Sequence, residues 1–342
     1  MHPLSFQEED LALLHCLQIA PRVTWTDLAP VLSTTPTALA ARWHRLRSSG
    51  LAWVGSYPDA RRDTLVTSLV EIDVAPGRRA EVVNLLCRDP RAISVEESAR
   101  GRDLLLTVLT KDLASLTRFV LDEMDGINGI DRQRTHLATA VHSDGTSWRL
   151  DALNKEQQAA CEVIAAAIGP QSGVAQPKDV ADLVDALARD GRASAAELAR
   201  LTGRSPATVR RQLARIVGSG MLRFRCEVAQ LTSQWPIACT WVARVPPAEQ
   251  ERTVTALATL PELRLCISTT GDTNLMFTVW VRSLQHLMRL EHLLGEKLPW
   301  LGIVDNAVTL RTRKRVGWLL DDNGLATGEV IASSALTGNR QV

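Results

Sequence analysis

Apolar residues recur along this chain first at helical spacing and then at strand spacing. Residues 180–187 carry valine and leucine at steps of three and four, which is typical of an amphipathic helix. A second helix is predicted after Ser194, because Glu197 stands three residues later as in a capping box, and a third after Ser205, which is followed by proline. Residues 221–226 then alternate, as a strand does. This order predicts a winged helix-turn-helix.

Beyond this unit the pattern changes to strand, helix, strand, strand, helix, strand. The predicted elements are residues 238–245, 248–259, 263–270, 274–281, 283–295 and 302–311. That order predicts a ferredoxin-like domain, in which helices cover one face of an antiparallel sheet. The other face, to which we assign Trp241, Phe277, Val279 and Trp280, is too apolar to stay in water. We expect it to meet a second sheet, either in the same chain or in another copy.

Both patterns occur twice, which makes the chain a tandem repeat of one two-domain unit. Residues 9–51 match residues 179–221 without a gap at an offset of 170, and the later segments match at about 171. The predicted fold class is α+β, with a winged helix-turn-helix plus a ferredoxin-like (βαββαβ) domain in each half. The predicted boundaries are 5–62 and 178–228 for the helix-turn-helix units, 65–142 and 236–320 for the ferredoxin-like domains, 143–177 for a helical linker, and 321–342 for a flexible tail.

Composition and charge narrow the class of protein. Six cysteines are scattered without metal or disulfide spacing, and no apolar run approaches the ~18 residues of a membrane helix. We therefore expect a soluble, cytoplasmic protein with no membrane partner. Residues 178–225 carry 10 Lys and Arg against 5 Asp and Glu, whereas the equivalent residues 5–62 carry 6 against 5. If both segments bind nucleic acid, we expect the second to hold phosphates more strongly.

The third helix of each helix-turn-helix unit has a polar face. In the second copy Arg211 and Arg215 fall opposite the apolar positions, and such a helix fits the DNA major groove, where side chains contact base edges. The predicted DNA-contacting residues are Ser205, Thr208, Arg210, Arg211 and Arg215 in the second copy, with Arg204 and Arg223 on phosphates, and Thr35, Thr37, Arg42 and Arg45 in the first copy. The alternative is that these arginines only solvate a helix face.

The coupled domains resemble the Lrp/AsnC family of bacterial transcription regulators, in a duplicated form. The residues that carry the resemblance are Leu198, Ala199, Ser205, Val209, Arg215, Ile216, Gly220 and the turn 270–275. The resemblance implies that the chain binds double-stranded DNA, responds to a small-molecule effector such as an amino acid, and forms homo-oligomers through its ferredoxin-like domains.

The turn between the third and fourth elements of the second ferredoxin-like domain is the candidate effector site. Gly271 permits a tight turn, Asp272 can pair with the ammonium group of an amino acid, and Thr269, Thr270 and Asn274 add hydroxyl and amide groups. The alternative is an ordinary hairpin, since Gly-Asp is a common turn pair.

No catalytic constellation occurs in the sequence. There is no nucleotide-binding glycine fingerprint, nucleophile elbow, paired carboxylate or metal-ligand spacing, so we expect no enzyme and no cofactor. One alternative is a siroheme decarboxylase-like enzyme, because those enzymes are similar to this family and also occur as fused double units. Such an enzyme needs cationic and imidazole groups near the cleft, where Cys266, Ser268 and Thr269 stand instead. Another alternative is a nucleoid-associated DNA binder without an effector.

Overall fold

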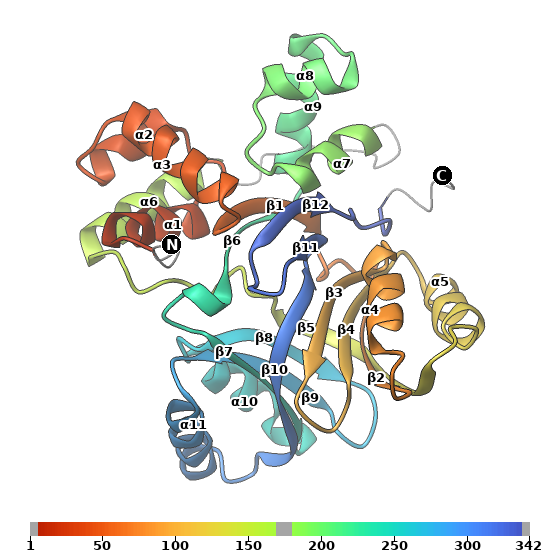
Figure 1. Ribbon diagram of the computed structural model, residues 1–342. Coiled ribbons are helices and arrows are strands. Elements are labelled where there is room, and N and C mark those ends of the chain that lie inside the picture. The colour runs from red at the N-terminus through yellow and green to blue at the C-terminus, as the bar shows by residue number, and fades with distance from the viewer. Residues whose placement is uncertain (1–5, 169–179, 337–342) are drawn as a thin grey trace.

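The computed structural model describes residues 6–168 and 180–336, and it divides into two helical heads above a large sheet (Figure 1). Head 1 contains α1 (Glu8–Ile19), α2 (Trp25–Val31) and α3 (Pro36–Ser48), and head 2 contains α7 (Ala181–Arg189), α8 (Ala195–Thr202) and α9 (Pro206–Gly218). The predicted capping box is present, since Ser194 accepts from the amide of Glu197 and the Glu197 side chain accepts from the amide of Ser194. Local capping therefore sets where α8 begins.

The strand after each helix triplet joins the two heads to one another. Strand β1 (Ala52–Pro58) pairs antiparallel with β6 (Leu222–Val228), so each predicted wing strand has its counterpart from the other head as partner. Two arginines strengthen this junction reciprocally: Arg22 donates to the carbonyl of Ala193, and Arg192 donates to the carbonyl of Val23. The two heads therefore form one unit.

Below the heads, the two ferredoxin-like domains share one closed sheet. Sheet domain 1 contains β2 (Val66–Val74), α4 (Arg79–Arg88), β3 (Ala92–Ser98), β4 (Leu104–Thr110), α5 (Leu113–Thr117) with a π-helical turn at Arg118–Glu123, and β5 (Ile130–Ser143). Sheet domain 2 contains β7 (Ile237–Arg244), α10 (Gln250–Ala258), β8 (Leu263–Thr269), β9 (Leu275–Val281), α11 (Leu284–Lys297) and β10 (Gly302–Arg315). The long strands β5 and β10 each pair with a strand of the sister domain, namely β8 and β3, and β10 also pairs with β7. The fold class is thus the predicted tandem, and the sister domain in the same chain supplies the second sheet.

The side chains on the inner face of the closed sheet differ in part from those that the sequence indicated. Trp241, Phe277 and Val279 pack beneath the helices of sheet domain 2, in the cluster that includes Leu257 and Leu290. The inner face carries their strand neighbours, in a cluster of Leu69, Leu105, Val242, Ile267 and Met276. The prediction is wrong for Trp241, Phe277 and Val279, because successive side chains of a strand point to opposite sides and these three lie beneath the helices. Trp280 points to the other side, where it lines the interior together with Leu105 and Ile267.

The segment after β10 is ordered where a flexible tail was predicted. Strand β11 (Trp318–Leu320) pairs with β10, and β12 (Ala326–Val330) pairs with β11. The indole of Trp318 packs on Trp53, so apolar burial holds this segment against the β1–β6 ribbon. The tail prediction is therefore wrong for 321–336, and residues 337–342 lie outside the described chain.

The predicted linker contains a helix that belongs to head 1. Helix α6 (Lys155–Ile168) buries Cys161 in the head 1 cluster, with Ile164 packed beside it. The last part of the predicted linker, residues 169–177, lies outside the described residues. Among the helices of the described ranges, none is long and apolar enough to span a bilayer.

Candidate functional site

The outer face of α9 carries three free arginines. Arg210, Arg211 and Arg215 are exposed, and they form no hydrogen bond or ion pair with any residue that the structure describes. The opposite face buries Val209 and Ile216 in the head 2 core, which fixes the rotation of the helix. The amino end is exposed as well. Ser205 caps the helix through the amide of Thr208, and the two hydroxyl groups lie 2.9 Å apart.

The same face of head 1 has a much weaker positive charge. Arg42 and Arg45 of α3 both donate to the buried carboxylate of Asp10 in α1. Burial alone would raise the pKa of Asp10, but the hydrogen bonds from Arg45, the Gln7 amide and Arg42 lower it below its usual value. Both arginines are thus held by an internal acid.

The other predicted residues of head 1 are exposed at the amino end of α3. Thr35 caps the helix by accepting from the amide of Ala38, and the Thr37 side chain is exposed. Alanines at 40 and 41 occupy the positions of Arg210 and Arg211. The two heads therefore share a shape but differ in the charge that they present.

Arg204 and Arg223, the two arginines assigned to phosphates, both contact other side chains of the protein. Arg204 donates to Gln212 and pairs with Asp182 at 2.8 Å, so it ties the start of α9 to α7. Arg223, on β6, donates to the hydroxyl of Thr146 between β5 and α6. Arg223 is half-buried and lies near Asp144 as well, and its contact with phosphate stays a prediction.

The candidate effector turn between β8 and β9 is held largely by its own hydrogen bonds. Asn274 uses its whole amide on the backbone of Val245, with both distances at 2.8 Å, and Thr269 donates to the carbonyl of Thr273. Gly271 has φ +113, a left-handed conformation that favours glycine. Thr270 and Asp272 are exposed. The structural role accounts for Thr269 and Asn274, and an effector role for Thr270, Gly271 and Asp272 stays a prediction.

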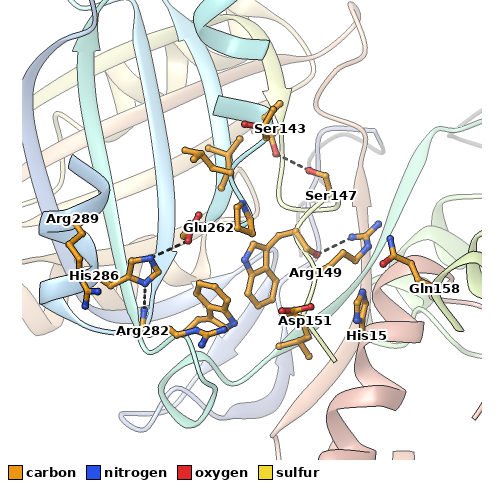
Figure 2. Close-up of a pocket in the computed structure, with 18 of the residues that line it drawn as sticks. His15, Ser143, Ser147, Arg149, Asp151, Gln158, Glu262, Arg282, His286 and Arg289 are labelled. Atoms are coloured by element: carbon orange, nitrogen blue, oxygen red, sulfur yellow. Dashed lines mark hydrogen bonds and ion pairs between the residues drawn. The ribbon is translucent and has the colours of Figure 1, made fainter. Parts of the chain in front are cut away.

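A cavity of about 870 Å³ lies between head 1 and sheet domain 2, and the sequence analysis missed it (Figure 2). Its lining comes from α1, the stretch from the end of β5 into α6, Trp235 before β7, the end of α10 with the turn before β8, and α11 with the residues before it. The titratable or cationic side chains among them are His15, His142, Arg149, Asp151, Glu262, Arg282, His286 and Arg289. No local pattern indicates this site, because these segments are far apart in the sequence.

Known proteins match this chain in both heads and over somewhat less than half of its length. The model of the AsnC-type helix-turn-helix domain matches residues 8–47, and that of the IclR helix-turn-helix domain matches residues 180–225. An uncharacterized HTH-type transcriptional regulator of Pyrococcus horikoshii is 24% identical over 144 residues, covering 42% of this chain and 91% of the relative. The HTH-type transcriptional regulator LrpC of Bacillus subtilis is 25% identical over 128 residues, covering 37% and 87%. Nearly complete relatives thus fit within half of this chain.

Solved structures also match the tandem arrangement as a whole. The siroheme decarboxylase NirDL has a TM-score of 0.55 at 13% sequence identity, covering 90% of this chain and 93% of that one. Its co-complex with an iron-uroporphyrin III analogue has a TM-score of 0.56 at 15% identity. At this identity the likeness concerns the fold, and it shows that two heads on two joined sheet domains recur as one architecture.

Proposed function

Because the chain belongs to the Lrp/AsnC family of helix-turn-helix proteins, we propose that it is a transcription regulator that binds operator DNA through its heads. The observation that carries the proposal is the free, exposed cationic face of α9. A side chain held by no internal partner is available to a phosphate or a base edge without first breaking a hydrogen bond. Arg210, Arg211 and Arg215 meet that condition, with Ser205 and Thr208 at the end of the helix that enters the groove.

Head 2 provides most of the affinity in this proposal. Head 1 presents Thr35 and Thr37 at the same position, but Arg42 and Arg45 must share the charge of Asp10. Head 1 therefore positions the pair on DNA more than it binds phosphate. The β1–β6 ribbon keeps both heads in one unit, so they meet the duplex together.

The test is the recovery of specific DNA by the full chain. Purified protein is incubated with sheared genomic DNA of its source organism, and bound fragments are sequenced. We expect enriched fragments to share a motif, and a variant with Arg210→Ala, Arg211→Ala and Arg215→Ala to recover none above background. Equal enrichment by the variant, with circular dichroism unchanged, would contradict the assignment.

We also propose that a small molecule, in the first instance an amino acid, alters assembly or DNA affinity through the sheet domains. The support is the family itself and the exposed Thr270 and Asp272 beside a left-handed Gly271. Titration calorimetry with the twenty amino acids, on the native chain and on Asp272→Ala, tests this site. Light scattering with and without the bound amino acid tests whether chains associate further. Heats that are absent throughout, or unchanged in the variant, would reject the turn as an effector site.

A second candidate is an activity like that of the siroheme decarboxylase. The observation that favours it is the cavity beside head 1, which is lined by histidines and arginines. Such an enzyme needs these groups, and the strand that carries Cys266 and Thr269 does not provide them. Anaerobic incubation with siroheme, followed by absorption spectra and measurement of released carbon dioxide, tests it. An unchanged spectrum and no gas above a protein-free control would remove this candidate.

A further inference from the structure

The cavity between head 1 and sheet domain 2 has a predominantly cationic wall. Arg282, His286 and Arg289 come from α11 and the residues before it, and Arg149 and His15 lie across the space from them (Figure 2). Two acids also line the cavity. Glu262 is paired with His286 at 3.2 Å, and Asp151 is exposed. With three arginines against two carboxylates, one of them already paired, the cavity favours an anionic guest.

Tryptophan side chains form its apolar wall. Trp148 and Trp235 both line the cavity and meet edge to face, with ring centroids 6.1 Å apart. The guanidinium of Arg282 lies over the Trp235 ring at 4.8 Å. Trp148 and Trp235 are 2% and 5% exposed, so only the edges of these rings reach the cavity, beside the Arg282 cation. Such a lining suits a guest that combines an aromatic ring with an anion.

Two buried N–H groups in the lining have no hydrogen-bond partner among the residues that the structure describes. His15 is 3% exposed, and its Nδ1 accepts from the amide of Ala152, which places the proton on Nε2. Burial lowers the pKa of His15 to about 4, so the ring is neutral and Nε2 is a donor. Within the described chain neither this atom nor Nε1 of Trp148, a residue 2% exposed, has a hydrogen-bond acceptor. Buried donors of this kind are costly unless an acceptor binds to them.

The duplication supplies an internal comparison for the indole group. Both long strands, β5 and β10, are followed by a Trp-x-Leu-Asp segment whose tryptophan is Trp148 in one case and Trp318 in the other. The Nε1 of Trp318 donates to the carbonyl of Ala188 in head 2 at 3.1 Å. Trp148 Nε1, the equivalent donor beside head 1, lacks such an acceptor among the described residues. The contact that joins Trp318 to head 2 therefore has no counterpart between Trp148 and head 1.

The equivalent space at the other junction is partly filled by the chain itself. At the offset of 171, Arg282 and Arg289 correspond to Lys111 and Arg118, which line a smaller cavity of about 330 Å³. Ser334 and Ala335 line that cavity too, and Ala335 is buried in a cluster with Ile93 and Leu109. The carboxyl-terminal segment therefore occupies the second junction, whereas the first is open.

We propose that the open cavity binds an organic anion with a flat aromatic ring and at least one carboxylate. The ring of the guest lies against Trp148 and Trp235, and its carboxylate binds Arg282 and Arg289. His15 Nε2 donates a hydrogen bond to an acceptor atom of the guest. A guest of this class bridges α1 of head 1 and sheet domain 2, so its binding sets how the joined heads sit over the sheet. That consequence rests on the proposed DNA-binding function, whereas the binding itself does not.

The probe for the binding step is 1-pyrenebutyrate, with 1-pyrenebutanol as the uncharged match. Quenching of tryptophan fluorescence is titrated on the full chain without DNA. We expect saturable quenching by the carboxylate and affinity about tenfold weaker for the alcohol, since it lacks a charge-assisted hydrogen bond. The variant Arg282→Ala with Arg289→Ala should abolish that preference, whereas Lys111→Ala with Arg118→Ala at the filled junction should retain it. Equal affinities for the two probes, or equal loss in both variants, would overturn the proposal.

A second arm separates this site from the DNA-binding function. DNA affinity is measured by fluorescence anisotropy on a recovered fragment, with and without saturating pyrenebutyrate. A change of about threefold or more, absent in the Arg282/Arg289 variant, supports coupling of the cavity to the heads. Bound probe with no change in DNA affinity overturns the coupling. Probe binding by a chain that recovers no specific DNA supports the cavity and rejects only the regulator.

Discussion

The unequal charge of the two heads leads to a prediction that salt dependence can measure. Arg210 and Arg211 of α9 are free and exposed, whereas Arg42 and Arg45 of α3 share the carboxylate of Asp10. Two double alanine variants, one in each helix, remove the same number of arginines. If the cations act through phosphates, the two variants must differ in how steeply DNA binding falls with salt.

The magnitude follows from counterion release. Each phosphate neutralised contributes about −0.9 to the slope of log K against log salt. Loss of Arg210 and Arg211 should make the slope shallower by about 1.8, so that a fourfold rise in salt weakens the native chain about 12-fold more than the variant. In α3 the acid offsets one of two charges, so the change should not exceed about 0.9, or about 3.5-fold over the same range.

The assay is fluorescence anisotropy with a labelled duplex between about 50 and 200 mM salt, the range over which this effect is large. Arg252→Ala serves as the control, because Arg252 lies over Trp300 in sheet domain 2 and away from both heads. Its slope should equal that of the native chain. Circular dichroism checks that each variant is folded. Equal slope changes for the two heads would refute the assignment of most affinity to head 2.

Three further predictions concern individual buried groups. Asp10→Asn releases both arginines of head 1, so the salt slope of DNA binding should steepen by up to about 0.9; an unchanged or shallower slope in the same anisotropy assay contradicts the internal neutralisation. Glu227 is 2% exposed and pairs with Arg225 and Arg264. Glu227→Gln leaves these cations uncompensated and should reduce the free energy of unfolding in urea by about 3–5 kcal/mol, whereas a loss below about 1 kcal/mol argues against a tight cluster. His15 has a pKa lowered by burial to about 4, so the unfolded chain takes up its proton first as pH falls from about 6.5, and stability should drop by up to about 3 kcal/mol by pH 4. Urea unfolding of the native chain and of His15→Gln should show that part of the pH dependence only in the native chain.

Local patterns predicted most of the elements because their causes are local. The capping box at Ser194 and the cap at Ser205 use residues three positions apart, so the sequence contains the whole interaction. Local patterns do not specify which strands pair with one another. Pairing of β1 with β6 joins segments 170 residues apart, and no periodicity within either strand specifies it. The same lack of long-range information led to the wrong choice of the inner sheet face.

The candidate DNA-binding face shows the same difference between features with local causes and features that depend on long-range contacts. The exposed arginines of α9 follow from the helical period, because Val209 and Ile216 must be buried. The neutralisation of Arg42 does not follow, because Asp10 lies 32 residues earlier and its buried position depends on how α1 packs on α3. The cavity beside head 1 does not follow from the sequence, since its lining comes from segments that are far apart in the chain.

The two halves have diverged in opposite senses. Head 2 retains free cations, and its junction with sheet domain 1 is closed by the chain, since Trp318 donates to Ala188 and Leu336 packs on the head 2 core. Head 1 has internal neutralisation of its cations, and its junction with sheet domain 2 is open and lined by unsatisfied donors. A head that provides most of the DNA affinity benefits from being held rigidly against its sheet domain. A head that contributes little affinity can be moved by a ligand without dissociation of the protein–DNA complex. Because the ribbon joins the heads, the proposed guest at the open junction would act on both, and the proposed DNA binding and ligand response would then lie in different halves of a single chain.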